Sequence, residues 1–317
     1  MALYDVKNLS FKYNQSDVPT FENVNFSVDG GDFILLAGEN GSGKSTLLRL
    51  LKKNITSYGK YEGDILFDGK NLINLDDLSA SKDIGYLCQN IDEQIVTDKV
   101  YHELAFPLEN FGIPSDKIKI RLAEIAAFFN IENLFFRDIK SLSGGQKQLV
   151  NIASIMTLNP RVILLDEPTS QLDPLARQEF IDYLDKINKN YNVSIIIIEH
   201  NIDEVIHLCN KIMFMTKGGI KYYDETKNVL SLLSKNESER EFLPSITKLF
   251  AYNNIDFFPI DIREGKKYIE EHKVSLKKFE KRVLNVNFNS YENAKTENKN
   301  IVDQNIDKKM IVRAKMI

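Results

Sequence analysis

One stretch of glycine, lysine and serine residues has the types and spacing of a phosphate-binding loop. Gly38-Glu-Asn-Gly-Ser-Gly-Lys-Ser45 fits the P-loop pattern Gly-x-x-x-x-Gly-Lys-Ser in full. Such glycines let backbone N–H groups curl around phosphate oxygens, and the N-terminus of a following helix favours the anion. Lys44 is expected to reach the β and γ phosphates, and the Ser45 hydroxyl to coordinate Mg²⁺. The residues predicted to bind nucleotide here are Gly38, Glu39, Asn40, Gly41, Ser42, Gly43, Lys44, Ser45 and Thr46. A glycine-rich turn ahead of a helix is the alternative, which the preceding apolar strand and the Lys-Ser pair disfavour.

A second motif consists of two acidic residues that follow a short apolar run. Val162-Ile-Leu-Leu-Asp166-Glu167 reads as a buried strand that ends in two carboxylates. Asp166 can hold Mg²⁺ through water, and Glu167 is our candidate to polarise the attacking water. The alternative is a strand that merely ends in acidic loop residues. The motif therefore indicates a nucleotide site only in combination with the phosphate loop.

Ser141-Leu-Ser-Gly-Gly-Gln146-Lys-Gln148 predicts the start of another helix. Ser143 and Gln146 have N-cap and N3 spacing, and Gly144 and Gly145 leave the first N–H groups open for a phosphate. The stretch resembles the LSGGQ signature of ABC ATPases. In that family two ATPase domains pair head to tail, which implies that Ser143, Gly144, Gly145 and Gln146 contact the ATP held by a partner domain. An ordinary capped surface helix is the alternative.

The remaining motifs occur in the order of the same family and extend the resemblance over residues 1–230. Gln89 resembles the Q-loop glutamine, which senses Mg²⁺ and the partner, and Ser170-Gln-Leu-Asp173 resembles the D-loop. His200 resembles the switch histidine that contacts the γ-phosphate, and Tyr13 the aromatic residue that stacks on adenine. Tyr13 as a core residue and His200 as an incidental histidine are the alternatives.

The resemblance therefore implies an ATP hydrolase that uses ATP and Mg²⁺. The implied catalytic residues are Glu167, His200, Gln89 and Lys44. The implied metal-binding residues are Ser45, Gln89 and Asp166.

The elements that must position these residues alternate between strands and helices. Such an alternation indicates a parallel α/β sheet. The buried strands are predicted over residues 33–37, 162–165, 193–198 and 212–215, and the helices over residues 44–53, 174–188 and 203–209. The resemblance implies a P-loop NTPase fold over residues 1–233, with a RecA-like core, an N-terminal antiparallel β subdomain and a helical subdomain at about residues 89–158.

Charge, cysteine content and the length of apolar runs weigh against several other classes of protein. Lys+Arg 41 against Asp+Glu 45 gives a net charge of −4, which weighs against a nucleic-acid partner. Two cysteines cannot form a disulfide framework. The first residues lack the features of a signal peptide, and the longest apolar run, residues 193–198, is too short to cross a bilayer. A role at the membrane is therefore expected to depend on partner proteins.

Residues 89–114 narrow the resemblance to the ATPases of energy-coupling-factor (ECF) transporters, which include cobalt and nickel importers. Gln89-Asn-Ile-Asp-Glu-Gln94 is similar to their Gln-Asn-Pro-Asp-x-Gln, and Ile91 departs from it at the proline. The resemblance implies a transmembrane coupling subunit, a substrate-binding membrane subunit, uptake of a vitamin or metal ion, and a location on the cytoplasmic face of the cell membrane. The alternatives are an ABC ATPase of another importer class, one of a non-transport system, or a binding-only module.

The C-terminal part has a different character. Residues 234–273 resemble the short helical extension that helps ECF ATPases to dimerise, and residues 274–310 resemble a linker. Residues 311–317 can be aligned with residues 3–9, which suggests the first strand of a second, absent ABC domain; an unrelated apolar tail is the alternative. The partner domain is thus expected to be a second copy, a related subunit or the second half of a tandem chain.

Overall fold

The computed structural model describes residues 2–272 of the chain. It divides into two compact units, one reaching to Val229 and the other beginning at Leu230, so the boundary predicted after residue 233 falls within the same helix as the observed one. The linker predicted over residues 274–310 and the strand predicted over residues 311–317 lie outside the described residues.

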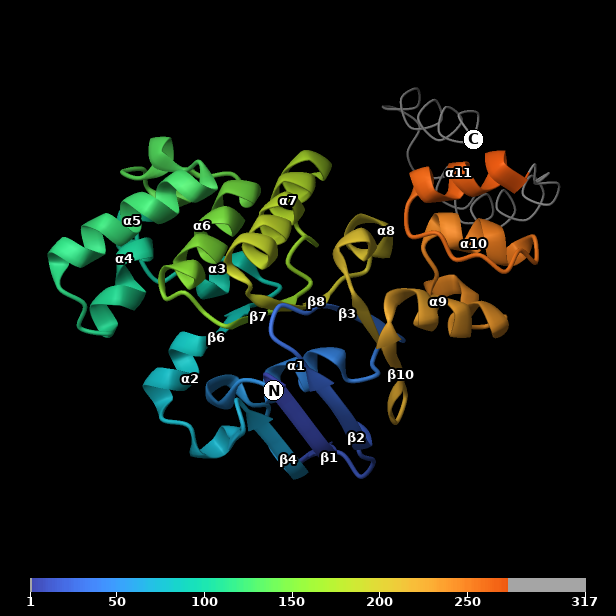
Figure 1. Ribbon diagram of the computed structural model, residues 1–317. Coiled ribbons are helices and arrows are strands. Elements are labelled where there is room, and N and C mark those ends of the chain that lie inside the picture. The colour runs from blue at the N-terminus through green and yellow to red at the C-terminus, as the bar shows by residue number, and fades with distance from the viewer. Residues whose placement is uncertain (1, 273–317) are drawn as a thin grey trace, which may run out of the picture. The chain divides into compact units, whose positions relative to one another are not determined.

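The first unit contains all the strands and most of the helices of the described part of the chain (Figure 1). The strands are β1 Tyr4–Tyr13, β2 Phe21–Val28, β3 Phe33–Gly38, β4 Gly59–Phe67, β5 Lys70–Asn71, β6 Ile84–Leu87, β7 Val162–Asp166, β8 Ser194–Ile198, β9 Lys211–Thr216 and β10 Gly219–Glu225. The α-helices of both units together are α1 Lys44–Leu50, α2 Asp77–Asp83, α3 Ile91–Gln94, α4 Val100–Asn110, α5 Ser115–Phe129, α6 Gly144–Thr157, α7 Pro174–Tyr191, α8 Ile202–Val205, α9 Thr226–Lys235, α10 Ser245–Tyr252 and α11 Ile262–His272. Of these, α10 and α11 belong to the second unit.

The central sheet has the strand order β10-β9-β3-β8-β7-β6, and its strands are parallel except for β10. Every residue of β7 and β8 is buried, because both faces of the sheet are covered. Successive side chains point to opposite faces. Ile34, Leu164 and Ile196 belong to one face, where they share a core with α1 and the N-terminal strands. The opposite face lies against α6 and α7, which Figure 1 shows on the other side of the sheet from α1.

A smaller antiparallel sheet, formed by strands from the N-terminal part of the chain, packs against this core. Its strand order is β2-β1-β4-β5. The inward-facing side chains of β1 and β2, among them Tyr4, Val6 and Phe26, pack on the same core cluster as α1. The antiparallel β subdomain implied by the sequence is therefore present, and α1 lies between the two sheets.

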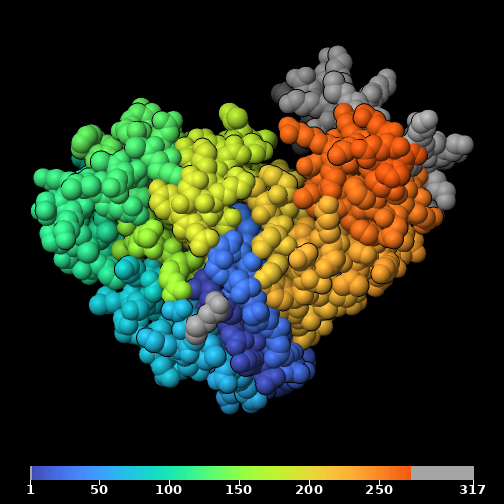
Figure 2. Space-filling view, viewed as in Figure 1, coloured from blue at the N-terminus to red at the C-terminus, as the bar shows by residue number. Residues whose placement is uncertain are grey.

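The helical subdomain consists of α3, α4, α5 and α6. Helix α5 buries Ile118, Leu122, Ile125 and Phe129, an amphipathic spacing of three and four residues. The Arg121 guanidinium donates to the carbonyls of Met156 and Thr157 (2.8 and 3.0 Å), which satisfies acceptors at the end of α6. In Figure 2 the subdomain forms the teal and green part of the surface of the first unit.

Two helix ends differ from the sequence prediction. Helix α1 ends at Leu50 rather than residue 53, and the Tyr4 hydroxyl takes the carbonyl of Leu51 (2.7 Å). The helix predicted over residues 203–209 is an α-helix only to Val205 and continues as a 3₁₀ turn, because Asn210 must already bond the amide of Phe33 at the sheet.

The second unit is a small helical cluster. Helix α10 contributes Ile246, Leu249 and Phe250 to its apolar core. Asp261 precedes helix α11, and its Oδ1 accepts from the Glu264 amide (2.8 Å). Nowhere in residues 2–272 does a helix combine the length and the apolar character needed to span a bilayer.

Candidate functional site

The glycine-rich loop connects β3 to α1, the arrangement that the phosphate-loop prediction requires. Lys44 Nζ donates to the carbonyls of Gly38 and Glu39 (2.9 and 2.8 Å), so it lies over its own loop. Burial lowers the pKa of Lys44, while the nearby carboxylates of Glu167 and Asp166 act in the opposite direction. Within the described residues the buried Ser42 hydroxyl has no hydrogen-bond partner, a polar group that a phosphate oxygen could satisfy.

The Mg²⁺ residues predicted from two distant motifs are in contact. Ser45 Oγ, at the start of α1, donates to Asp166 Oδ1 at the end of β7 (2.8 Å). Asp166 is only 4% exposed. A hydroxyl and a carboxylate at this spacing suit Mg²⁺, which prefers oxygen ligands and completes its shell with phosphates and water. The residues present therefore fit the ion.

Two of the other predicted catalytic residues, Gln89 and His200, contact the Glu167 carboxylate. Glu167 Oε2 accepts from Gln89 Nε2 (2.7 Å), and Glu167 Oε1 lies 2.9 Å from His200 Nε2. The three residues follow β6, β7 and β8, whose carboxyl ends meet at one edge of the sheet. Glu167 has a φ of 50°, a left-handed conformation that turns the chain sharply after the strand.

Tyr13 lies near the phosphate loop rather than in the core. Its ring is 37% exposed, and its hydroxyl is 2.6 Å from Thr46 Oγ1. Phe11 packs edge-on against the ring (4.8 Å between centroids). An exposed aromatic ring beside the loop is available to stack on a base.

The signature residues are placed apart from this cluster. Ser143 Oγ accepts from the Gln146 amide (3.3 Å), and the Gln146 side chain accepts from the Ser143 amide (3.1 Å). This capping box confirms the predicted helix start, and the hydrogen bonds of these two side chains run to each other and not to the phosphate loop. The glycines Gly144 and Gly145 form the first turn of α6.

Helix α6 contacts both the Q-loop segment and the acidic motif. Lys147 Nζ pairs with Asp92 (2.7 Å), Asn151 Nδ2 donates to the Ile91 carbonyl (3.1 Å), and Gln148 Nε2 donates to the Pro168 carbonyl (2.6 Å). Asp92, an acidic residue of the Q-loop segment, is thus engaged within the chain by Lys147. Ile91 occupies the first position of α3, so the helix forms without the family's proline.

Tyr86, on β6, contacts the site, although no sequence motif identified it as a candidate. The Tyr86 hydroxyl donates to Asp166 Oδ2 (3.1 Å) and accepts from Arg49 Nε (3.4 Å). Burial, assisted by the charge of Asp166, raises the pKa of Tyr86 to about 12. No local sequence pattern signals Tyr86, because the pairing of β6 with β7 that brings it to Asp166 is a feature of the fold.

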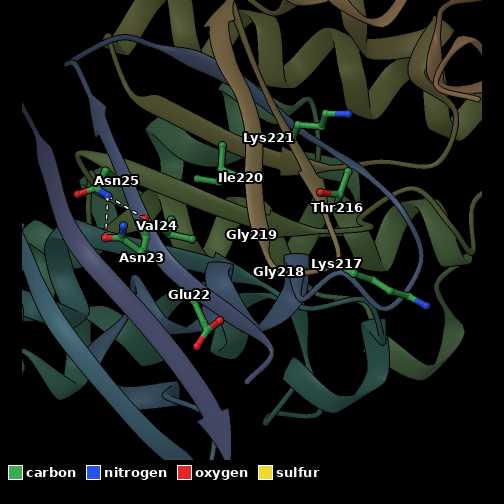
Figure 3. A pocket seen from close by; sticks show the side chains of 10 residues that line it. All are labelled: Glu22, Asn23, Val24, Asn25, Thr216, Lys217, Gly218, Gly219, Ile220 and Lys221. Carbon is green, nitrogen blue, oxygen red and sulfur yellow. Dashed lines mark hydrogen bonds between the residues drawn. The ribbon is translucent and has the colours of Figure 1, made fainter. Parts of the chain in front are cut away.

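A hollow of about 480 Å³ lies elsewhere, between β2 and the β9–β10 hairpin. Figure 3 shows Asn23 and Asn25 bonded to each other, and Lys217 and Lys221 extending away from the hollow. None of the predicted site residues lines it.

Comparisons with a family model, with the sequences of known proteins and with solved structures all indicate the ABC transporter family. A family model described as ABC transporter matches residues 21–170. An ABC transporter ATP-binding protein, by its description, from Bacillus anthracis is 42% identical over 266 residues, which are 84% of this chain and 48% of that protein. The energy-coupling factor transporter ATP-binding protein EcfA1 of Oenococcus oeni is 34% identical over 260 residues, which are 81% of this chain and 92% of that protein. The chain spans about half (48%) of the length of the Bacillus relatives it matches.

Solved structures agree with these relatives. The structure of cbiO1 from Clostridium perfringens, described as part of the ABC transporter complex cbiONQ, has a TM-score of 0.66 and 29% identity, over 74% of this chain and 94% of that one. A dimeric ATP-binding cassette, MJ0796, bound to ADP and Pi in a post-hydrolysis state, has a TM-score of 0.61 and 25% identity, over 70% of this chain and 98% of that one. The predicted fold class is confirmed.

Proposed function

Because the chain belongs to the ABC transporter ATPase family, we propose that it is the ATP-binding and ATP-hydrolysing subunit of an ECF-type importer. The observation that carries the proposal is the pair of contacts made by Glu167, whose two carboxylate oxygens lie beside Gln89 and His200. Sequence separates these residues widely, and the sheet edge brings them together next to the phosphate loop.

The proposed reaction is attack of water on the γ-phosphorus of ATP, which breaks the bond to the β–γ bridging oxygen and releases ADP and inorganic phosphate. Glu167 accepts the proton of the attacking water, and His200 holds the γ-phosphate in orientation. Mg²⁺, when bound, neutralises charge on the phosphate oxygens. Most of the rate gain is then positioning and electrostatic stabilisation by groups that are already in place.

Nucleotide is held by residues from three parts of the fold. Lys44 leaves the carbonyls of its loop for the β and γ phosphates, while Ser45 and Asp166 provide oxygens for Mg²⁺. Gln89 is proposed as a further oxygen donor to the ion, which would require it to release Glu167. Tyr13 stacks on the adenine through its exposed ring face.

A second ATPase domain completes the site. Ser143, Gly144, Gly145 and Gln146 are proposed to close over the ATP of that partner domain, because the start of α6 offers backbone N–H groups to a phosphate. The side chains of Ser143 and Gln146 bond each other's backbone amides rather than the chain's own phosphate loop. The partner is a second copy, a related subunit or a second half of a tandem chain. The dimeric cassette among the structural neighbours supports this pairing.

Membrane subunits are proposed to dock beside α3. Val96 lies in the connection that follows that helix, Phe106 lies on α4, and they are 61% and 40% exposed. Apolar side chains left in solvent in the segment that follows the Q-loop glutamine suit a coupling segment of a membrane protein. In this arrangement the chain works at the cytoplasmic face of the membrane, and a vitamin or a metal ion such as cobalt is taken up by a separate membrane subunit.

The test is Mg²⁺-dependent ATP hydrolysis by the full chain alone and after reconstitution in liposomes with the multispanning membrane proteins encoded beside its gene. We expect hydrolysis in both, with stimulation by the membrane proteins and uptake of their bound cargo. Hydrolysis without physical association with any of those proteins would exclude the importer function. Absence of ATP binding would exclude the ATPase function itself.

A further inference from the structure

Asp166 is held by two hydroxyl groups, only one of which belongs to the phosphate loop. Ser45 Oγ donates to Oδ1 (2.8 Å), and Tyr86 Oη donates to Oδ2 (3.1 Å). An ionised carboxylate can only accept hydrogen bonds, so the phenol must be the donor in the second contact. Both oxygens of this buried side chain are therefore assigned to a particular partner.

Tyr86 is itself oriented from a third element. Arg49 Nε, on α1, lies 3.4 Å from the Tyr86 hydroxyl. Since the N–H donates to the phenol oxygen, the phenol proton is directed away from Arg49 and toward Asp166. A chain of contacts thus runs from α1 through β6 to the end of β7.

We propose that Tyr86 is a positioning residue for the Mg²⁺ site, through the hydrogen bond by which it fixes the rotation of the Asp166 carboxylate. With Oδ2 bonded to Tyr86, Oδ1 remains on the side of Ser45, the other residue proposed here to provide an oxygen for Mg²⁺. This inference rests on the proposed ATPase function. Groups that orient metal ligands in this way affect metal affinity by about 10-fold to 100-fold.

Other buried tyrosine hydroxyls in this fold make a different kind of contact. Tyr4 donates to the carbonyl of Leu51 (2.7 Å), and Tyr183 donates to the carbonyl of Phe129 (2.8 Å). Both satisfy backbone acceptors and leave the orientation of side chains unaffected. Tyr183 lies on α7 and bonds the end of α5, so Tyr183→Phe removes a tyrosine hydroxyl that donates to the backbone and does not contact Asp166.

The experiment compares Tyr86→Phe with Tyr183→Phe in the full chain. Mn²⁺ replaces Mg²⁺ as the probe. Its binding to the protein–ATP complex is measured by electron paramagnetic resonance in a titration with Mn²⁺. ATP affinity is measured separately in the presence of EDTA. We expect Tyr86→Phe to weaken Mn²⁺ binding about 10-fold, while metal-free ATP affinity stays within about twofold. Tyr183→Phe should change neither value.

The outcomes separate this inference from the proposed function. If the unaltered protein binds no ATP, the ATPase proposal fails before any variant is compared. If it binds Mn²⁺ with ATP and Tyr86→Phe binds the metal equally well, the positioning role is wrong. Should Tyr86→Phe not accumulate in folded form, Arg49→Gln tests the same chain of contacts: an affinity for Mn²⁺ reduced in the same direction supports it, and an unchanged affinity overturns it.

Discussion

The Gln89 side-chain amide donates to the Glu167 carboxylate across 2.7 Å, although 78 residues separate the two in sequence. Gln89 directly follows β6 and Cys88, and Glu167 directly follows β7. The parallel pairing of these strands is what brings the two side chains together. A residue expected to sense the membrane partner is thereby bonded to the proposed catalytic base.

Replacement of Gln89 by alanine tests this link. Gln89→Ala should leave the affinity for ATP within about twofold and lower the rate of hydrolysis by about 10-fold to 100-fold, the usual cost of losing a group that orients a site. Steady-state ATPase assays over a range of ATP concentrations separate the two quantities. Gln178→Ala, on the exposed face of α7, is the matched control. An unchanged maximal rate in Gln89→Ala would contradict the role given to the contact.

Replacement of Glu167 tests the proposed base. Glu167→Gln keeps the shape of the side chain and removes its ability to accept a proton, so ATP should still bind while hydrolysis slows by about 100-fold or more. Single-turnover hydrolysis, measured together with ATP binding, checks both parts. Glu179→Gln, an exposed residue of α7, should behave as the unaltered protein. Near-normal turnover in Glu167→Gln would remove Glu167 as the base.

Glu199 predicts a pH dependence of stability. Burial raises the pKa of this carboxyl from 4.5 to about 7, although its contact with the Thr169 amide acts against the shift. The folded state therefore retains a proton that the unfolded state loses between these values, and the free energy of unfolding falls as the pH rises through this range. At about 1.4 kcal/mol per pH unit, the effect is of the order of 3 kcal/mol.

Glu199→Gln should abolish this contribution, because the amide stays neutral at every pH. Urea unfolding of the variant and of the unaltered protein should therefore show a stability difference that shifts in favour of the variant between pH 4.5 and pH 7. Glu179→Gln should show no such trend. A difference between Glu199→Gln and the unaltered protein that is the same at both ends of the range would contradict the prediction.

Two glycines of the phosphate loop should differ in their tolerance of a methyl group. Gly38 has a φ of 133°, and a Cβ there would lie 1.9 Å from the Met215 carbonyl oxygen. Gly41 has a φ of 75°, with nothing within 4 Å of a Cβ. Gly41→Ala should cost about 1–2 kcal/mol of unfolding free energy for the left-handed conformation alone. Gly38→Ala should cost about 3 kcal/mol or more, since overpacking is added. Equal urea midpoints for the two variants would contradict this.

The sequence by itself determined the local patterns from which the candidate site residues were predicted. The phosphate loop, Asp166 with Glu167, and the capped start of α6 are local patterns in which residue type and spacing already specify a turn, a strand end or a helix start. Ser143 and Gln146 illustrate this, because their capping box depends only on residues three apart. The helix predicted from residue 174 also begins at a local pattern, because the Asp173 side chain accepts from the Leu175 and Ala176 amides.

Only the tertiary structure decided which of these groups meet. The contacts of Ser45 with Asp166 and of Tyr86 with Asp166 depend on the strand order of the sheet, in which β6 pairs with β7 although the chain between them forms the helical subdomain. Likewise, the pairing of Asp92 with Lys147 depends on how α3 packs against α6. Patterns of neighbouring residues do not predict such pairings, because the pairings follow from the burial of whole helices and strands against one another. It is these pairings that bring Glu167 to Gln89 and Asp166 to Tyr86.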